Sequence, residues 1–216
     1  MIGYNRPTIK EKDINSVKKI LKNQWITQGS NVTKFQNDLK KRFGCKYCIV
    51  LSSGTAALYL SAIALKIKKN DLVITSPNTF IATVNAFAHF GAKVDLVDIK
   101  NDDFTIDTYL LEQKLIFYKK NKKKIKAVIG VDYAGQPCDW KRLSYLSKKY
   151  KFKLINDNCH ALGSKYYSSE KYAVKYADIV TQSFHAVKNI TTGEGGAVFP
   201  NSKSLYLKMD ILKNHG

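Results

Sequence analysis

One lysine in this chain lies where it could act as a nucleophile. Lys188 falls between Ser183 and the glycine-rich turn 193–196, and its neighbours Ala186 and Val187 are apolar. A lysine amine held in a partly dry pocket has a lowered pKa and can form a Schiff base with a carbonyl group. This segment therefore predicts covalent chemistry at Lys188.

A carboxylate that complements this lysine comes at the end of an apolar run. Asp157 directly follows Leu154-Ile155-Asn156, a pattern typical of a buried strand. A Schiff-base lysine and a buried aspartate are what pyridoxal phosphate requires: the lysine holds the aldehyde, and the carboxylate keeps the ring nitrogen protonated. The two residues together predict a site for this cofactor.

The composition predicts a globular protein that needs neither disulfides nor metals to fold. The chain has 216 residues, of which 44% are hydrophobic, enough for a substantial core. The first seven residues lack the apolar stretch of a signal peptide, and no apolar run approaches the roughly 20 residues of a membrane span. We therefore expect a cytoplasmic protein with no membrane partner.

The strongly positive net charge allows two interpretations. The formal net charge is +19, which raises the possibility of nucleic-acid binding. The densest basic cluster, 119–124, contains no aromatic residue and accompanies no nucleic-acid motif, so solvated lysine-rich surfaces are favoured and no nucleic-acid partner is expected. A positive field would also attract an anionic substrate.

The four cysteines predict reduced thiols rather than a metal site. Cys45 and Cys48 form a C-x-x-C pair, which suits half of a zinc site or a redox pair, but Cys138 and Cys159 are distant. Because Cys48 falls in the apolar run 47–51, we expect a buried strand there and no bound metal.

The order of apolar patterns predicts an α/β fold. A capping box at Thr8 and Glu11 opens a helix to Lys22, and Asn31 is expected to cap a second helix that ends at Gly44. Strands are expected near 47–51, 72–75, 94–98, 126–131, 153–156, 178–183 and 197–199, with helices near 54–66, 79–90, 107–118 and 139–150. Asp107 and Asp139 are the expected N-caps of the last two helices. This alternation favours three α/β/α layers around a mainly parallel seven-stranded sheet.

Candidate chemical residues follow successive strands of this expected sheet. In such sheets ligands bind beyond the carboxyl ends of the strands. Any one of these residues has an ordinary structural explanation, but their shared position favours one site. They are Thr55 and Ala56 in a small-residue turn, Phe80, the segment 132–135, Asp157, His160, Ser183, His185 and Lys188.

These residues lie in motifs of a known family. The chain resembles the sugar-nucleotide aminotransferases of the DegT/DnrJ group, which are fold type I pyridoxal-phosphate enzymes. The resemblance covers nearly the whole chain, and the phrases near 131–135, 160–164 and 183–197 are most similar to the branch that makes pseudaminic acid precursors. Its motifs are Trp25-Ile26-Thr27-Gln28-Gly29, Ser53-Gly54-Thr55-Ala56-Ala57-Leu58, Val131-Asp132-Tyr133-Ala134-Gly135, His160-Ala161-Leu162-Gly163-Ser164, the lysine segment and Asn214-His215-Gly216.

The resemblance implies a role for each candidate residue. Lys188 would hold the cofactor aldehyde and shuttle the proton, Asp157 would pair with the ring nitrogen, and Phe80 would stack on the ring. Thr55, Ala56 and Ser183 would hold the phosphate, and His160 would lie near the ring. The substrate would contact Tyr4, Gln28, His185 and Glu194, although Glu194 suits a turn-stabilising role as well.

The resemblance further implies a reaction and its partners. The expected reaction transfers an amino group from glutamate to carbon 4 of a UDP-linked 4-keto-6-deoxy-N-acetylhexosamine, in a homodimer. Family members continue into a smaller C-terminal domain, so residues 1–216 correspond to an N-terminal segment plus the large cofactor domain, with the smaller domain absent. Two alternatives stay open: a non-catalytic remnant, and an aminotransferase for another nucleotide sugar. Dehydrating relatives carry histidine in place of the lysine, so Lys188 argues against that reaction.

Overall fold

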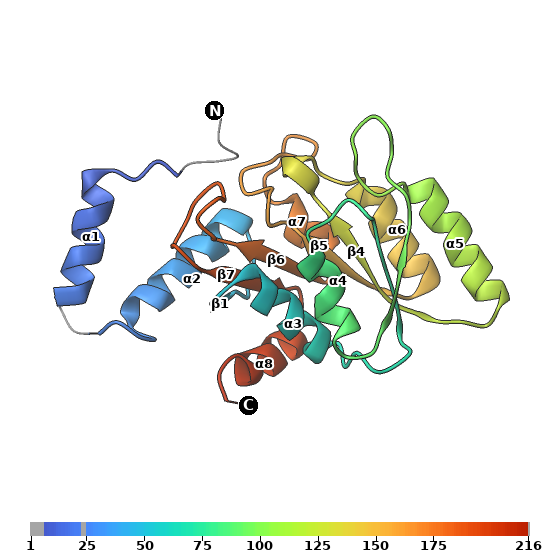
Figure 1. The fold of residues 1–216 in the computed structure, drawn as a ribbon, viewed down its shortest axis with the longest axis horizontal. Coiled ribbons are helices and arrows are strands. Elements are labelled where there is room, and N and C mark those ends of the chain that lie inside the picture. The colour runs from blue at the N-terminus through green and yellow to red at the C-terminus, as the bar shows by residue number, and fades with distance from the viewer. Residues whose placement is uncertain (1–6, 23–24, 216) are drawn as a thin grey trace.

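The protein is built on one twisted sheet of seven strands in the order β1-β7-β6-β5-β4-β2-β3 (Figure 1). This computed structural model describes residues 7–22 and 25–215. Strand β7 is antiparallel to both of its neighbours, and the other adjacent pairs are parallel, so six strands point the same way. The predicted mainly parallel seven-stranded sheet is confirmed.

The strands lie close to their predicted positions. Most carry fully buried β-branched and apolar residues, as expected for a sheet covered on both faces. Their bounds are β1 Ile49–Leu51, β2 Leu72–Thr75, β3 Lys93–Leu96, β4 Ile125–Val131, β5 Lys153–Asp157, β6 Ile179–Ser183 and β7 Gly196–Pro200.

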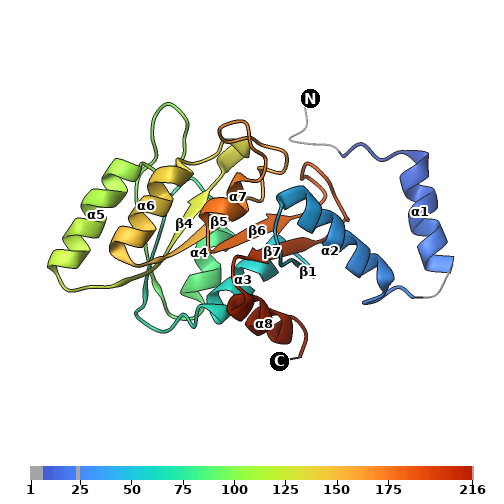
Figure 2. The ribbon, with the colours of Figure 1, turned by 180° about the vertical axis from the view of Figure 1, so that it is seen from behind.

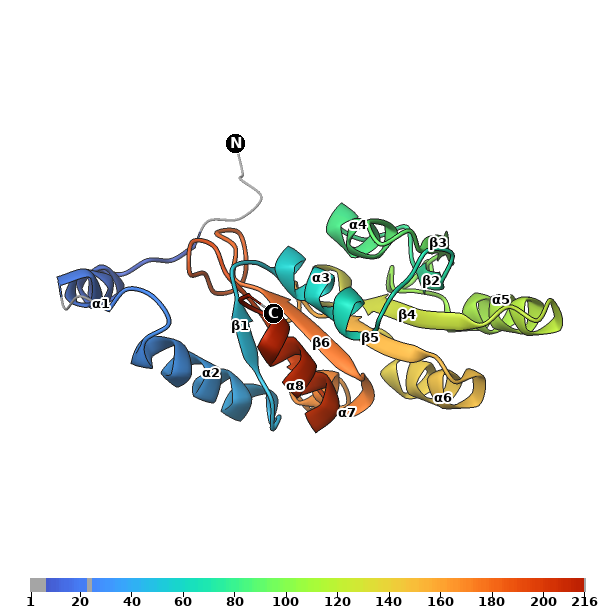
Figure 3. The same ribbon diagram turned by 90° about the horizontal axis from the view of Figure 1, so that it is seen from below.

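Helices cover both faces of the sheet, which gives three layers (Figures 2 and 3). One apolar core lies under α3 (Gly54–Ala64), α4 (Ile81–Ala88) and α8 (Lys203–Leu212). The core on the opposite face lies under α2, α5, α6 and α7. These four helices span Ser30–Phe43, Thr108–Lys120, Trp140–Tyr150 and Tyr172–Tyr176.

Two predicted helix starts are confirmed by side-chain caps. The Asp107 carboxylate accepts hydrogen bonds from the backbone N–H groups of Tyr109 and Leu110 at the start of α5. The Asp139 carboxylate accepts one from the Arg142 N–H at the start of α6. Each satisfies donors that the first helical turn leaves without an intrahelical acceptor.

Two other predicted caps are wrong. Helix α1 begins at Glu11, not after Thr8, because the Asp13 carboxylate accepts the Lys10 N–H at 2.9 Å and makes Lys10 the flanking residue. Helix α2 begins at Ser30, and the extended Gly29 is its N-cap, so Asn31 lies inside the first turn. The predicted end of α2 is confirmed, because Gly44 takes the left-handed conformation (φ 67°) of a C-cap.

The hydrophobic pattern of the sequence did not predict three elements, two of them short and one near residue 216. These are the 3₁₀ turn η1 at Tyr133–Gly135, helix α7, and helix α8. Helix α1 (Glu11–Lys22) was expected, but it lies apart from the sheet at one end of the molecule and has no buried residue (Figures 1 and 2).

The cysteines are free thiols, as predicted. Cys48 is buried just before β1 rather than inside it, because its carbonyl accepts the Gln36 side chain of α2 at 3.1 Å. Burial raises the pKa of Cys45 to about 11 and raises that of Cys48 too, which keeps both thiols protonated. Across residues 7–22 and 25–215 there is no metal-binding cluster of His, Cys, Asp or Glu, and no helix there is long and apolar enough to span a bilayer.

Candidate active site

The predicted residues meet in a pocket of about 550 Å³ at the carboxyl edge of the sheet. Because six strands share one direction, the segments that follow β1, β2, β4, β5 and β6 all reach this edge. The predicted residues that line the pocket are Thr55, Phe80, Asp157, His160, Ser183, His185, Lys188 and Glu194. Ser53, Gly54, Thr79, Tyr133 and Cys159, which lie in the same segments, line it as well.

The start of helix α3 forms one wall of the pocket. The Ser53 hydroxyl caps the helix by accepting the Ala56 N–H at 3.0 Å. Within the described chain, the backbone N–H groups of Gly54 and Thr55 have no protein acceptor. A helix N-terminus with free donors and an exposed threonine hydroxyl suits a phosphate group. Ala56 does not line the pocket; its N–H donates to the Ser53 hydroxyl that caps the helix.

Two glycines allow this wall to sit against the sheet. A Cβ on Gly54 would lie 2.9 Å from the Ser183 Cβ and 3.1 Å from the Cys159 sulfur. A Cβ on Gly196 would overlap the carbonyl group of Ser53 and lie 2.6 Å from the Gly54 nitrogen. Backbone therefore touches backbone where β7 passes the start of α3.

Replacing Gly196 with alanine is expected to lower the free energy of unfolding by about 3 kcal/mol, because backbone atoms rather than a flexible side chain must move. Urea denaturation measures this loss. Gly193→Ala is the comparison: its Cβ meets nothing within 4 Å, so only the left-handed conformation (φ 78°) costs energy, about 1 kcal/mol. Equal losses in the two variants would show that Gly196 has room for a side chain.

Asp157 ends strand β5 with both carboxylate oxygens engaged. Oδ2 accepts the Thr83 hydroxyl at 2.6 Å, and Oδ1 accepts the Cys159 N–H at 3.3 Å. Asp157 is 5% exposed, and its open side faces the pocket. Thr83 was not among the predicted site residues; its only signal in the sequence is its position three residues after Phe80.

Aromatic and imidazole side chains lie around the mouth of the pocket. Phe80 is 66% exposed and precedes α4, so one side of its ring is open. His160 follows Asp157, and its Nδ1 accepts the Ala134 N–H at 3.4 Å. Burial, and then the positive charge of Lys188, lowers the pKa of His160 below its usual 6.5. The imidazole is therefore neutral at pH 7, with its proton on Nε2.

Lys188 lies in the loop 184–195, which connects the antiparallel strands β6 and β7. The loop is closed at its base, where the Phe184 N–H donates to Gly195 at 2.8 Å and the Thr192 N–H donates to Phe184 at 3.0 Å. Phe184 is fully buried and packs edge-on against Phe35, 5.1 Å between ring centroids. The loop is thus anchored in the core while the half-buried Lys188 lines the pocket.

The residues predicted to contact substrate have different positions. His185 and Glu194 line the pocket and form an exposed pair, 3.6 Å between Nε2 and Oε1. Gln28 is not in the pocket lining; its side chain lies 3.5 Å from that of Asn214 near the end of the chain. Tyr4 lies outside the described residues.

A buried aspartate supports the turn beside the pocket. Asp132 is fully buried after β4 and accepts hydrogen bonds from the backbone of Cys138 and from the side chains of Trp140, Asn158 and Tyr172, at 2.7–2.9 Å. Burial raises the pKa of Asp132 to about 6. These bonds connect the segment carrying Tyr133 to Asn158, which lies between Asp157 and His160.

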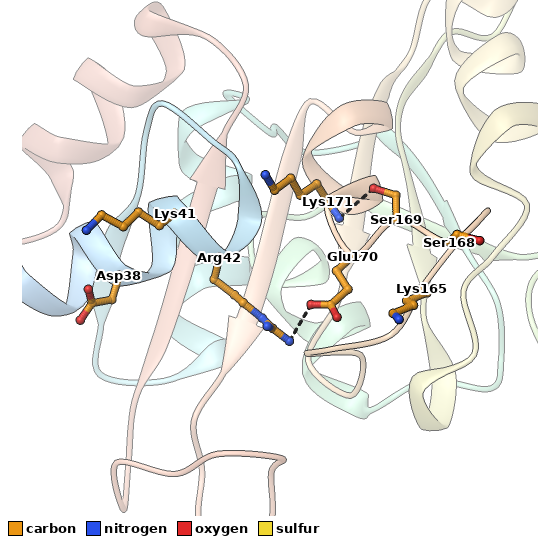
Figure 4. Close-up of a pocket in the computed structure, with 8 residues that line it drawn as sticks. All are labelled: Asp38, Lys41, Arg42, Lys165, Ser168, Ser169, Glu170 and Lys171. Carbon is orange, nitrogen blue, oxygen red and sulfur yellow. Dashed lines mark hydrogen bonds and ion pairs between the residues drawn. The ribbon is translucent and has the colours of Figure 1, made fainter.

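A second, more open hollow, which shares no lining residue with this pocket, lies between α2 and the segment 165–171 (Figure 4). Its volume is about 760 Å³, and an ion pair of 2.7 Å joins Arg42 to Glu170 across it. It is lined by charged and hydroxyl side chains and has neither the buried carboxylate nor the lysine of the first pocket. We therefore assign the chemistry to the smaller pocket.

Comparison with known proteins identifies the family. Residues 7–216 match the family model described as the DegT/DnrJ/EryC1/StrS aminotransferase family. The chain belongs to this family. A curated relative from Campylobacter jejuni serotype O:23/36, named UDP-4-amino-4,6-dideoxy-N-acetyl-beta-L-altrosamine transaminase, is 44% identical over 216 residues, which are 100% of this chain and 56% of the relative. The chain thus spans about half the length of the curated relatives it matches.

Solved structures of aminotransferases have the same fold. Helicobacter pylori PseC, described as an aminotransferase involved in pseudoaminic acid biosynthesis, superposes with a TM-score of 0.88 at 33% identity, over 99% of this chain and 56% of PseC. A putative sugar aminotransferase from Streptococcus pneumoniae in its PLP-form also gives 0.88, at 32% identity, over 100% of this chain and 58% of its own.

Proposed function

We propose that this chain is the cofactor-binding part of a pyridoxal-phosphate-dependent sugar-nucleotide aminotransferase. The observation that carries the proposal is the meeting of Lys188, the buried Asp157 and the free N-terminus of α3 in one pocket. Membership of an aminotransferase family and the PLP-form of a structural relative support it.

The residues present fit this cofactor. The pocket volume, about 550 Å³, is in the usual range for small-molecule sites. The close approach of Gly54 and Gly196 leaves the helix start free for a phosphate, and the open face of Phe80 suits a flat ring. Bound there, pyridoxal phosphate supplies a carbonyl group for amines and a ring that accepts electrons.

Each residue then has a chemical task. The Gly54 and Thr55 N–H groups, with the Thr55 and Ser183 hydroxyls, would bind the phosphate. Asp157 would pair with the ring nitrogen. The Lys188 amine would bind the aldehyde and, as a free amine, would take and return a proton at the reacting carbon. The neutral His160, which lines the pocket, would offer Nε2–H as a donor.

The substrate proposal follows the relatives. The Campylobacter jejuni relative is named for a UDP-linked amino sugar, and PseC for a role in pseudoaminic acid biosynthesis. We propose that the whole protein aminates carbon 4 of a UDP-4-keto-6-deoxy-N-acetylhexosamine, as a cytoplasmic homodimer that uses glutamate. An extended protein would include the smaller C-terminal domain. His185 and Glu194 at the pocket mouth are proposed substrate contacts, as are Gln28 and Tyr4.

The test is a spectral titration of the chain with pyridoxal phosphate, followed by glutamate. We expect a visible absorption band from lysine-bound cofactor, which glutamate removes as its amino group is transferred. Pyridoxal without the phosphate is the matched ligand control, and it should bind at least tenfold more weakly because the α3 N-terminus then has no anion to bind.

The other outcomes distinguish the alternatives. A band that glutamate leaves unchanged favours a remnant that binds cofactor without turnover. No band at any concentration would contradict the proposal that this chain holds the cofactor site. A glutamate-sensitive band followed by reaction with a different UDP- or dTDP-sugar would keep the aminotransferase and replace the substrate.

A further inference from the structure

Thr83 stands out because it is a fully buried hydroxyl directed at the buried carboxylate of the pocket. Its Oγ1 donates to Asp157 Oδ2 at 2.6 Å, a distance typical of a hydrogen bond from a hydroxyl to a carboxylate. The other oxygen, Oδ1, takes the Cys159 N–H at 3.3 Å. One donor from α4 and one from the turn after β5 therefore fix the plane of this carboxylate.

The position of Thr83 on its helix ties it to the pocket wall. Thr83 comes one turn after Phe80, and its N–H donates to the Phe80 carbonyl at 2.9 Å. Phe80 is the extended N-cap of α4 and Thr83 lies in its first turn, so the start of this one helix carries both the aromatic ring and the hydroxyl. A shift of this turn would move both groups relative to Asp157.

The hydroxyl has a chemical consequence. A hydrogen bond to each oxygen limits rotation of the carboxylate. When Asp157 pairs with a pyridine nitrogen, the proton between them stays on nitrogen only while a carboxylate oxygen faces that nitrogen. The titratable groups around Asp157 are the thiol of Cys159, with a raised pKa, the imidazole of His160 and the amine of Lys188.

We infer that Thr83 is a positioning residue that holds the Asp157 carboxylate in one orientation, so that the ring nitrogen of the bound cofactor carries the proton. This inference rests on the proposed function, because it needs pyridoxal phosphate in the pocket. It adds a residue outside the pocket lining that sets how strongly the cofactor withdraws electrons.

The test uses the full chain loaded with pyridoxal phosphate labelled with ¹⁵N in the ring, comparing wild type, Thr83→Val and Thr83→Ser. Valine keeps the shape and loses the donor; serine keeps the donor. We expect the ¹⁵N resonance at the protonated position in wild type and Thr83→Ser, and shifted toward the unprotonated position in Thr83→Val. The dissociation constant for the cofactor should rise about tenfold in Thr83→Val, the size expected for a hydrogen bond to a charged group.

The controls separate this inference from the proposed function. Wild type that shows no cofactor band contradicts the proposed function and, with it, the inference. Wild type that binds normally, beside a Thr83→Val variant with the same ¹⁵N shift and affinity, overturns the inference alone. In an Asp157→Asn background the Thr83→Val change should have no further effect on the ¹⁵N shift, because the carboxylate that Thr83 acts on is gone. If Thr83→Val loses its cooperative urea transition, Thr83→Ala makes the same comparison.

Discussion

Replacing Lys188 with alanine is expected to abolish the visible absorption band that pyridoxal phosphate gains in the wild-type chain. The half-buried Lys188 is the lysine of the pocket lining, so no other amine of that lining can bind the aldehyde. The phosphate contacts at α3 and the Asp157 carboxylate are unchanged, so the variant should still bind the cofactor, but at least 100-fold more weakly. Equilibrium dialysis measures the affinity, and absorption spectroscopy measures the band.

A matched lysine provides the control for this prediction. Lys203 begins α8 outside the pocket lining, and Lys203→Ala removes the same charge without touching the site. It should keep the band and the affinity of wild type. A band that persists in Lys188→Ala would show that the cofactor binds elsewhere on this lysine-rich surface.

Replacing Asp132 with alanine is expected to lower the free energy of unfolding by about 4 kcal/mol. Four buried donors lose their acceptor, and each unsatisfied donor costs roughly 1–3 kcal/mol. The total stays at the low end because Asn158 can still donate to the Tyr172 oxygen at 3.1 Å. Urea denaturation measures the loss. Asp210→Ala, which breaks the surface pair with Lys213, should cost under about 1 kcal/mol.

The charge of Asp132 also predicts a pH dependence. Its pKa is raised from 3.8 to about 6, so the folded state binds the proton more tightly than the unfolded chain. The part of the stability that comes from proton binding at Asp132 is therefore fully present below about pH 4 and is lost as the pH rises through 6, by about 3 kcal/mol in all. Asp132→Asn cannot ionise, so its deficit relative to wild type should shrink between pH 4 and pH 7. A constant deficit would mean that Asp132 does not titrate in this range.

The sequence predicted the sheet well because its strands have simple signals. Runs such as Ala127–Val131 and Leu154–Ile155 are apolar on both faces, which is typical of central parallel strands. The N-caps at Asp107 and Asp139 were also predictable, because few other capping residues lie near the start of either helix. Near Thr8 and Asn31 several capping residues stand close together, and the choice among them depends on local geometry that spacing does not encode.

The site was predictable where chemistry requires a particular residue type. Lys188 and Asp157 were identified from their types and their positions after strands, and they meet in the pocket. Thr83 and Gly196 act through distances of a few ångströms to segments far away in sequence, so no local pattern revealed them. Gln28 was predicted only from its motif, and the structure places its side chain beside Asn214 rather than in the pocket lining.

The reversed strand β7 imposes an order on assembly. Strand β1 lies at the edge of the sheet and pairs with β7, its single neighbour in the sheet, through Ile49↔Val198 and Leu51↔Gly196. Strand β1 is synthesised first but can join the sheet only after β7 has been synthesised, and such long-range pairing is slow. Because the start of α3 is fitted against Gly196, a nascent chain that has not reached this residue has no finished phosphate cradle. We therefore expect pyridoxal phosphate to bind only after β7 has been synthesised. The cofactor would then stabilise a sheet that is already formed and would not nucleate its folding.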